Sequence, residues 1–291
     1  MRKWSFRGES CSLDAEARSA APGEFVELPD GMTHYEIAGP PDGQSVVLVH
    51  GFCVPYHIWD PTFDALAQAG FRVLRYDLFG RGYSDRPDVT YDSDLFDRQL
   101  VSLVSALDIN LPLDVLGLSM GGAIAVVFTA QHPGMVRKLG LLDPVGIKSP
   151  LALKILRVPL LGEGLVSLFG DKALLSGLAT DFINPEQFPR YREQFLPQMK
   201  YRGFKRALLS TLRHGPFDVR QAYERVGRQN HPALLIWGRL DKTAPFETHK
   251  KVRQAIAHIE FHAIDEAGHI PHYERPEVVN SLLIEFLGKK S

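Results

Sequence analysis

The sequence predicts an α/β fold in which a mostly parallel β-sheet is flanked by helices. Two short, continuous runs of apolar and β-branched residues, Ser45–Gly51 and 113–119, are typical of strands buried on both faces of a parallel sheet. Helical patterns alternate with such runs over short connections, as in βαβ units. One interval, residues 146–216, is rich in leucine and holds no convincing strand, so it predicts a helical insertion.

The first two strands are expected to form a hairpin. Residues 25–37 alternate in polarity around the turn signal Pro29-Asp30-Gly31. The further strands are expected at residues 45–51, 71–77, 113–119, 136–144, 232–238 and 259–265. Helices are expected near 59–68, over 91–107, from 120 to the stop signal His132-Pro133, after Pro245 and over 276–287. Within the insertion, helical segments are expected in 151–170, 172–179 and 204–212.

Composition narrows the class of protein. The chain has 291 residues, of which 45% are hydrophobic and 23% charged, a balance typical of a folded globular chain rather than a disordered one. Its net charge of −1 argues against a nucleic-acid binder, which normally carries a basic excess. The two cysteines, Cys11 and Cys53, cannot supply a disulfide framework or a four-ligand zinc site. No apolar run is long enough to predict a membrane-spanning helix.

The opening segment, residues 1–23, is expected to be a polar lead-in that contacts the rest of the chain at most through Trp4 and Phe6. Charged residues interrupt it before an apolar signal-peptide core can form, which predicts a cytoplasmic location. The expected organisation is a lead-in at 1–23, an α/β core at 24–145 and 217–291, and the helical insertion at 146–216, at the sheet edge where such folds bind ligands.

The most informative residues are Gly117-Leu118-Ser119-Met120-Gly121, which fit the pattern G-x-S-x-G. A buried strand precedes this pentapeptide and a helix follows at once, so the turn between them is sharp. Such a turn forces its central residue into a strained backbone conformation, and flanking glycines let neighbouring elements pass. A helix N-cap would explain the serine but not both glycines. We therefore expect a serine hydroxyl exposed at the positive end of a helix dipole.

A serine hydroxyl is a poor nucleophile and needs a general base that a third group aligns. Two residues are suitably placed. Asp241 follows the strand at 232–238, and His269 follows the strand at 259–265. Because parallel strands end at the same sheet edge, both loops are expected to open beside Ser119. The three residues occur in the chain order serine, acid, histidine.

With these residues the chain resembles the α/β-hydrolase superfamily, in its serine esterase and C–C hydrolase-like branch, over residues 24–288. The resemblance rests on His50-Gly51-Phe52, on DLFGRGYS at 77–84, and on GLSMGG, GRLDKTAP and EAGHIPHYERP, which occur in the family's order. It implies a roughly eight-stranded, mostly parallel sheet with the insertion as a helical cap. It also implies that Ser119 is the nucleophile, His269 the base and Asp241 the acid, with an oxyanion hole formed by the N–H groups of Phe52 and Met120.

Other residues compete for these roles. Asp143 follows the sixth strand, a position that some relatives use for the acid, while Asp265 and Glu266 lie close to His269. Cys53 and His272 are expected to line the substrate pocket. His262 and His258 are expected to be structural. Because a pair of histidines lacks a third ligand, no metal is expected, and the chemistry needs no cofactor.

The predicted function is hydrolysis of small or medium apolar carboxylic esters through an acyl-enzyme. A serine at the turn, instead of a carboxylate, argues against a haloalkane dehalogenase or an epoxide hydrolase. The apolar insertion favours an apolar substrate, and HGFCVPYHIW departs from the glycine-rich loop of C–C hydrolases. C–C hydrolysis of meta-cleavage products, lipase or thioesterase activity, and a non-catalytic ligand-binding role stay open. So does the oligomeric state, a homo-oligomer included.

Overall fold

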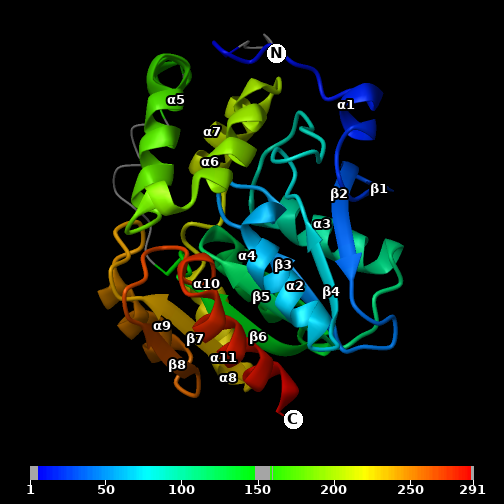
Figure 1. The fold of residues 1–291 in the computed structure, drawn as a ribbon, viewed down its shortest axis with the longest axis vertical. Helices are drawn as coiled ribbons and strands as arrows, with labels where there is room; N and C mark the ends of the chain where they lie inside the picture. The colour runs from blue at the N-terminus through cyan, green and yellow to red at the C-terminus, as the bar shows by residue number, and fades with distance from the viewer. Residues whose placement is uncertain (1–5, 148–157, 159, 290–291) are drawn as a thin grey trace.

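The computed structural model describes residues 6–147, 158 and 160–289, and its centre is an eight-stranded sheet. The strand order is β1-β2-β4-β3-β5-β6-β7-β8 (Figure 1). The hairpin strands β1 (Glu24–Leu28) and β2 (Gly31–Ala38) are antiparallel, and the other strands run parallel to one another. These are β3 (Ser45–Val49), β4 (Arg72–Tyr76), β5 (Leu113–Leu118), β6 (Val136–Leu142), β7 (Ala233–Gly238) and β8 (Glu260–Ile264). The predicted fold class is confirmed.

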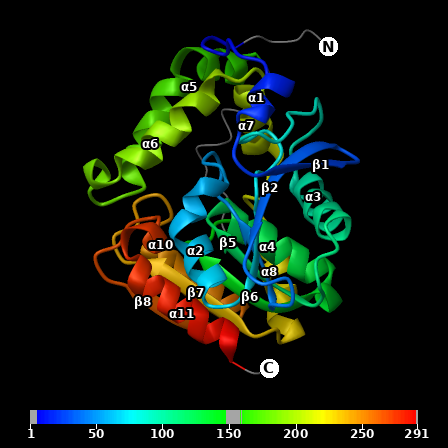
Figure 2. The same ribbon diagram turned by 45° about the vertical axis from the view of Figure 1, so that its right-hand side comes forward.

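Helices cover both faces of the sheet (Figures 1 and 2). In β3, Val47 and Val49 belong to the core cluster on one face, whereas Val46 and Leu48 belong to the cluster on the other. The first face is packed by α3 (Ser93–Ala106), α4 (Met120–Gln131), α8 (Arg220–Gln229) and α9 (His249–Ala255), and the second by α2 (Asp60–Gln68) and α11 (Pro276–Gly288). Burial on both faces explains why the strands are continuous apolar runs.

The described part of residues 146–216, which we call the helical insertion, lies beyond the carboxyl ends of the parallel strands (Figure 1). Its described part contains α5 (Leu161–Thr180), α6 (Pro189–Phe195) and α7 (Phe204–His214), with one isolated β-bridge at Tyr201 and no strand. Leu178, Phe195 and Phe204 join the core cluster of the second face, so the insertion packs onto the sheet. Of the helix predicted within 151–170, residues 151–157 and 159 lie outside the described ranges.

The segment before β1 contacts the insertion more extensively than predicted. Phe6 is buried as expected, and Trp4 lies outside the described residues. In addition, the Glu9 carboxylate accepts hydrogen bonds from the N–H groups of Gly203 at 3.0 Å and Lys205 at 2.7 Å, at the start of α7. A short helix, α1 (Ala15–Ser19), follows. The sequence pattern missed this because a carboxylate that binds backbone N–H groups has no signature in polarity.

A buried carboxylate organises the loop after β4. Asp77 accepts hydrogen bonds from the N–H groups of Tyr56 and Tyr83, both at 2.9 Å, and pairs with Nδ1 of His34 at 2.7 Å. Burial raises the pKa of Asp77, but His34 and the backbone N–H groups outweigh it and hold the pKa at about 2. Burial also lowers the pKa of His34, and the Asp77 charge reverses this to a net rise. Both pKa shifts favour the charged forms of this buried pair.

Replacing Asp77 with asparagine is expected to lower the free energy of unfolding by about 3–5 kcal/mol, because it leaves His34 without its buried counter-charge. Urea unfolding at neutral pH measures this. A carboxyl group whose pKa is depressed stabilises the fold above its unfolded pKa and loses that contribution as the pH falls towards about 2. The difference between wild type and variant should therefore narrow below about pH 4.

The matched control is Asp88→Asn, because Asp88 is paired with Arg206 on the surface and is 70% exposed. An exposed pair of this kind contributes about 0–1 kcal/mol. Equal losses in the two variants would contradict a special role for the His34–Asp77 pair.

None of the helices in the described ranges combines the length and apolarity that crossing a membrane requires.

Candidate active site

Ser119 lies at a strained turn between β5 and α4, as predicted. Its φ of 54° and ψ of −117° place it in a region that few non-glycine residues adopt. A Cβ atom on Gly117 would lie 2.3 Å from the carbonyl oxygen of Gly121, and one on Gly121 would lie 2.1 Å from that of Val49. Both positions therefore require glycine. The turn holds the Ser119 hydroxyl at the N-terminus of α4, the positive end of its dipole.

Asp241 and His269 meet beyond the ends of β7 and β8. Oδ2 of Asp241 accepts a hydrogen bond from Nδ1 of His269 at 2.8 Å. Oδ1 accepts from the N–H groups of Thr243 at 2.7 Å and Ala244 at 2.8 Å, which orients the carboxylate. The Asp241 and His269 residues are only 7% and 4% exposed. Because Nδ1 carries the proton, Nε2 of the imidazole is left as the basic nitrogen.

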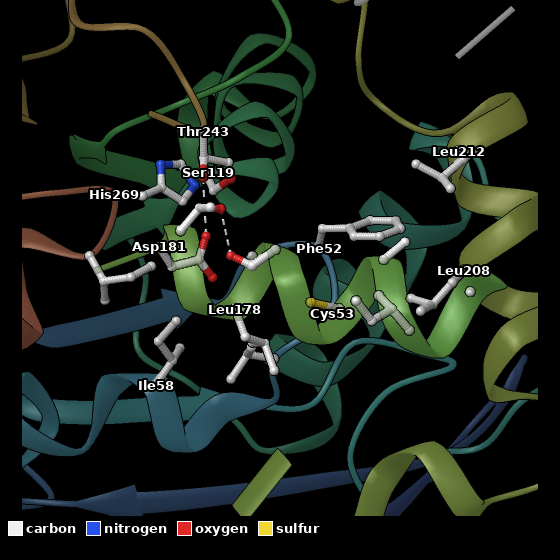
Figure 3. A pocket seen from close by; sticks show the side chains of 18 of the residues that line it. Phe52, Cys53, Ile58, Ser119, Leu178, Asp181, Leu208, Leu212, Thr243 and His269 are labelled. Atoms are coloured by element: carbon white, nitrogen blue, oxygen red, sulfur yellow. Dashed lines mark hydrogen bonds between the residues drawn. The ribbon is translucent and has the colours of Figure 1, made fainter. Parts of the chain in front are cut away.

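The imidazole is tuned by the charges around it. Burial lowers the pKa of His269, but the charge and hydrogen bond of Asp241, together with the charges of Asp181 and Glu274, produce a net rise above the ordinary value of 6.5. Ser119 and His269 line the same cavity (Figure 3). Within the described residues, no hydrogen bond joins their side chains. In enzymes such bonds often form only once substrate is bound.

Asp143, the competing acid, lies after β6 and directly beside this pair. Its Oδ1 accepts a hydrogen bond from the N–H of Gly238 at 2.9 Å, and Asp143 is not among the residues that line the cavity described below. Burial and the neighbouring Asp241 carboxylate raise the pKa of Asp143 well above its usual value, which favours its protonated form. Asp143 thus lies beside Asp241, but Asp241 is the acid that forms the hydrogen bond to the imidazole of His269.

The other competing residues lie at the surface. Asp265 pairs with Arg239, and Glu266 pairs with Arg275. Their carboxylates are about four-fifths exposed, at 80% and 78%. His262 bonds Glu260, and His258 bonds the carbonyl of His231. None of these four contacts the Ser119 cavity in the described structure.

One group of potential metal ligands occurs in the described residues: ligand atoms of Asp143, Asp241 and His269 lie within 4.8 Å of one another. Each residue is already engaged, because Asp241 binds His269 and both carboxylates accept backbone N–H groups. The hydrogen bond between Asp241 and His269 accounts for the closeness of these two residues, and the N–H of Gly238 positions Asp143 beside them.

The loop after β3 lies against Ser119. A Cβ atom on Gly51 would lie 4.0 Å from Oγ of Ser119, so the backbone approaches the hydroxyl closely. His50 accepts a bond from the N–H of Leu78 at 2.9 Å and bonds the carbonyl of Gly51, and burial lowers its pKa to about 4, so it is a neutral brace. Met120, the first residue of α4, has an N–H without an intrahelical acceptor.

Arg81 forms a hydrogen bond to this loop that the sequence did not predict. The guanidinium is fully buried, and its Nε donates to the carbonyl of Phe52 at 2.8 Å. Its other nitrogens donate to the carbonyl of Phe79 and the hydroxyl of Thr211. Burial lowers the pKa of Arg81 to about 10. A charged hydrogen bond thereby fixes the carbonyl of Phe52, one peptide unit after the Phe52 N–H that is expected in the oxyanion hole.

A cavity of about 640 Å³ surrounds Ser119 and His269, a size suited to a small organic molecule. Its walls are mostly apolar and come from both the core and the helical insertion (Figure 3). They include Phe52, Val54, Ile58, Leu165, Leu178 and Leu208. Polar lining is sparse, and one member, Asp181, was not predicted. Asp181 directly follows α5, and an isolated acid after a leucine-rich helix was its only sequence signal.

Cys53 and His272 differ in their placement. Cys53 lines the cavity, and burial raises the pKa of its thiol to about 12, so it is not a reactive thiolate. The prediction for His272 was wrong, because it lies in α10 (Pro271–Glu274), fully buried and outside the cavity lining. Its Nε2 bonds the carbonyl of Ile58 at 3.0 Å, and its ring packs on Trp59. The helical turn after Ile270 directs this ring into the core.

Comparisons with known proteins agree with the fold. Residues 46–282 match a sequence model described as the Alpha/beta hydrolase family. The 2-hydroxy-6-oxononadienedioate/2-hydroxy-6-oxononatrienedioate hydrolase 1 of Pseudomonas putida is 30% identical over 91% of this chain and 96% of its own length. The AB hydrolase superfamily protein YisY of Bacillus subtilis is 28% identical over 84% of this chain and 91% of its own. The crystal structure of the enol-lactonase from Burkholderia xenovorans LB400 superposes with a TM-score of 0.79 at 24% identity, covering 91% of this chain and all of that one.

Proposed function

Because this chain belongs to the alpha/beta hydrolase family, we propose that it is a serine hydrolase that cleaves small or medium apolar carboxylic esters through an acyl-enzyme. One observation carries the proposal. Ser119, held at a strained turn, opens onto the same apolar cavity as His269, whose other ring nitrogen is bonded to Asp241. A hydroxyl, a base and an orienting carboxylate are the parts that acyl transfer needs.

In this mechanism Oγ of Ser119 attacks the ester carbon while Nε2 of His269 takes the hydroxyl proton. The resulting oxyanion is stabilised by the N–H groups of Phe52 and Met120. When the intermediate collapses, the bond from carbon to the alkoxy oxygen breaks, and His269 returns the proton to the leaving alcohol. Water, activated by the same imidazole, then attacks the acyl-enzyme and releases the acid. Asp241 keeps Nδ1 protonated throughout.

We further propose that residues 146–216 act as a cap that selects the substrate. Leu165, Leu178 and Leu208, from α5 and α7, contribute apolar wall to the cavity that contains Ser119. Burying an apolar chain against such a wall contributes about 0.8 kcal/mol for each methylene group. This supports esters with apolar acyl or alcohol groups.

A second candidate is hydrolysis of a C–C bond, favoured by the 30% identity with the Pseudomonas putida hydrolase. That protein's name specifies a dioate, a substrate with two carboxylate groups. Here the cavity lining includes the carboxyl group of Asp181, and Lys205 is already paired with Asp171 at 2.7 Å. Lys242 also lines the cavity, but the Asp181 carboxylate would repel a dianion and the mostly apolar walls would match it poorly, so the apolar ester is the better match.

Labelling with a fluorophosphonate, followed by mass mapping of the modified peptide, tests the mechanism. We expect modification at Ser119 and none in Ser119→Ala. In parallel, p-nitrophenyl esters of increasing chain length and a dienedioate meta-cleavage product are assayed. Turnover of the esters alone supports the proposal, turnover of the dienedioate alone favours the second candidate, and an unlabelled Ser119 would overturn both.

The pH dependence of kcat/KM follows from the imidazole. Only neutral His269 can accept the hydroxyl proton, so activity should rise with pH through its pKa and fall about tenfold per pH unit below it. Because Asp241 gives the pKa of His269 a net rise, the midpoint should lie above 6.5. Initial rates of p-nitrophenyl butanoate hydrolysis across the pH range measure it. Asp265→Asn, a surface control, should leave the midpoint unchanged, and a midpoint well below the ordinary value would contradict this assignment.

A further inference from the structure

Asp181 places a carboxyl group inside the apolar cavity. It follows the last residue of α5 and lines the cavity together with Ser119 and His269. Figure 3 shows its side chain beside Thr243, on the side of the cavity where Ser119 and His269 lie. A carboxyl group in such surroundings is costly to desolvate and is kept only where it has partners or a task. The mechanism proposed above does not use it.

The partners that Asp181 has inside the protein are few and weak. The hydroxyl of Thr243 donates to its Oδ1 at 3.2 Å, and the hydroxyl of Tyr191 donates to its Oδ2 at 3.3 Å. Both distances exceed the usual range for hydrogen bonds between hydroxyl and carboxylate oxygens. In the described part of the chain Asp181 forms no ion pair. Since a carboxylate can accept about four hydrogen bonds, Asp181 retains capacity for another donor.

The carboxyl group is not needed to attach the insertion to the core, because backbone groups do this. The carbonyl oxygen of Asp181 accepts a hydrogen bond from the N–H of His269 at 2.8 Å. Next to it, Glu274 accepts from the N–H of Ile183 at 2.8 Å and from the N–H of Gly268. These contacts fix the backbone of Asp181 directly beside His269. The side chain is thus a pre-positioned acceptor beside the reacting groups.

On the premise of the proposed function, we propose that Asp181 is a specificity-determining residue that binds a hydrogen-bond donor of the substrate, a hydroxyl or ammonium group near the scissile ester. Such a substrate is apolar over most of its length and carries one donor close to the ester. The donor would bind Asp181 with a charge-assisted hydrogen bond inside a cavity whose walls are mostly apolar. An ester with a methyl group in its place would leave the carboxylate buried without that partner.

The test compares esters that differ only in the donor. Methyl 3-hydroxybutanoate and methyl 3-aminobutanoate are compared with methyl 3-methylbutanoate, and 2-hydroxyethyl butanoate with propyl butanoate. These pairs of esters distinguish a hydroxyl donor from an ammonium donor, and a donor on the acyl group from one on the alcohol group. For the preferred pair, we expect kcat/KM of the donor ester to exceed that of its methyl isostere by about 10- to 100-fold.

Two variants assign this preference to the carboxylate. Asp181→Asn should reduce the donor preference and Asp181→Leu should abolish it, because kcat/KM of the donor esters falls further than kcat/KM of the methyl isosteres. The matched control is Glu186→Gln, an exposed carboxylate of the insertion five residues further on, which should change no ratio. If Asp181 were only structural, its variants would lower kcat/KM for all esters alike and would have a lower melting temperature. That result would overturn the inference.

Binding to the Ser119→Ala protein separates this inference from the proposed function. Calorimetric titration with the same intact esters gives the Kd ratio of donor ester to isostere without turnover. A donor preference in Kd that Asp181→Leu removes, in a protein whose wild type hydrolyses no ester, would overturn the proposed function alone. Ester turnover with no donor preference in kcat/KM or Kd would overturn the inference alone. Absence of both turnover and selective binding would overturn both.

Discussion

Replacing Ser119 with alanine is expected to lower kcat for p-nitrophenyl butanoate by about 10⁵- to 10⁶-fold, the cost of losing the nucleophile of a serine hydrolase. The cavity and the Asp241–His269 pair would remain, but no group could form the acyl-enzyme. Initial rates at saturating substrate measure the effect. Circular dichroism and thermal unfolding should show that the fold persists, since the φ of 54° is set by the turn and not by the hydroxyl.

Nonadditivity provides the decisive control. If Ser119 and His269 act as one unit, the double variant Ser119→Ala/His269→Ala should be no slower than Ser119→Ala alone. If the loss in kcat of the double variant equalled the product of the two single losses, the two side chains would act independently. A Ser119→Ala protein that kept more than about one per cent of activity would contradict the assigned nucleophile.

Replacing Asp241 with asparagine is expected to lower kcat by about 10⁴-fold. The N–H groups of Thr243 and Ala244 require an acceptor, so the amide oxygen of asparagine should face them. Its NH₂ group would then face His269 and donate to Nδ1, which moves the ring proton to Nε2. In that tautomer the imidazole cannot accept the proton of Ser119. The kcat of purified Asp241→Asn measures this effect.

Asp143→Asn is the matched comparison, because Asp143 occupies the competing position after β6. Its carboxyl group favours the protonated form and accepts the N–H of Gly238, both of which asparagine can imitate. We expect a loss far smaller than that of Asp241→Asn. The reverse order of the two losses would show that the acid comes from the sixth strand after all.

Much of the fold was predictable because burial leaves a periodic trace in the sequence. The runs that became β3 and β5 are apolar at every position, and the structure buries each of them on both faces of the sheet. The strained turn around Ser119 could be predicted for a related reason, because a Cβ atom at Gly117 or Gly121 would collide with the backbone. Such local steric demands can be met by few residue types, so they mark their positions in the chain.

Less of the site was predictable, because its remaining parts depend on contacts between distant residues. His272 follows His269 by three residues, yet the turn of α10 directs it into the core, where it bonds Ile58. The hydrogen bond from Arg81 to the carbonyl of Phe52 joins two loops, and the sequence of neither loop indicates that the other lies beside it. Polarity alone cannot distinguish a buried polar group that faces a backbone atom from one that faces solvent.

The sequence by itself determined the α/β class, the strained serine turn and the serine–acid–histidine order, because each follows from short-range sterics or strand periodicity. Only the tertiary structure showed which acid bonds His269, since Asp143 and Asp241 end neighbouring strands and the Asp241 carboxylate is the one directed at the imidazole. It alone also brought Asp181 into the cavity, because the backbone bond between His269 and Asp181 joins segments 88 residues apart. Hydrogen-bond direction and long-range packing are properties of the folded chain, and no local pattern records them.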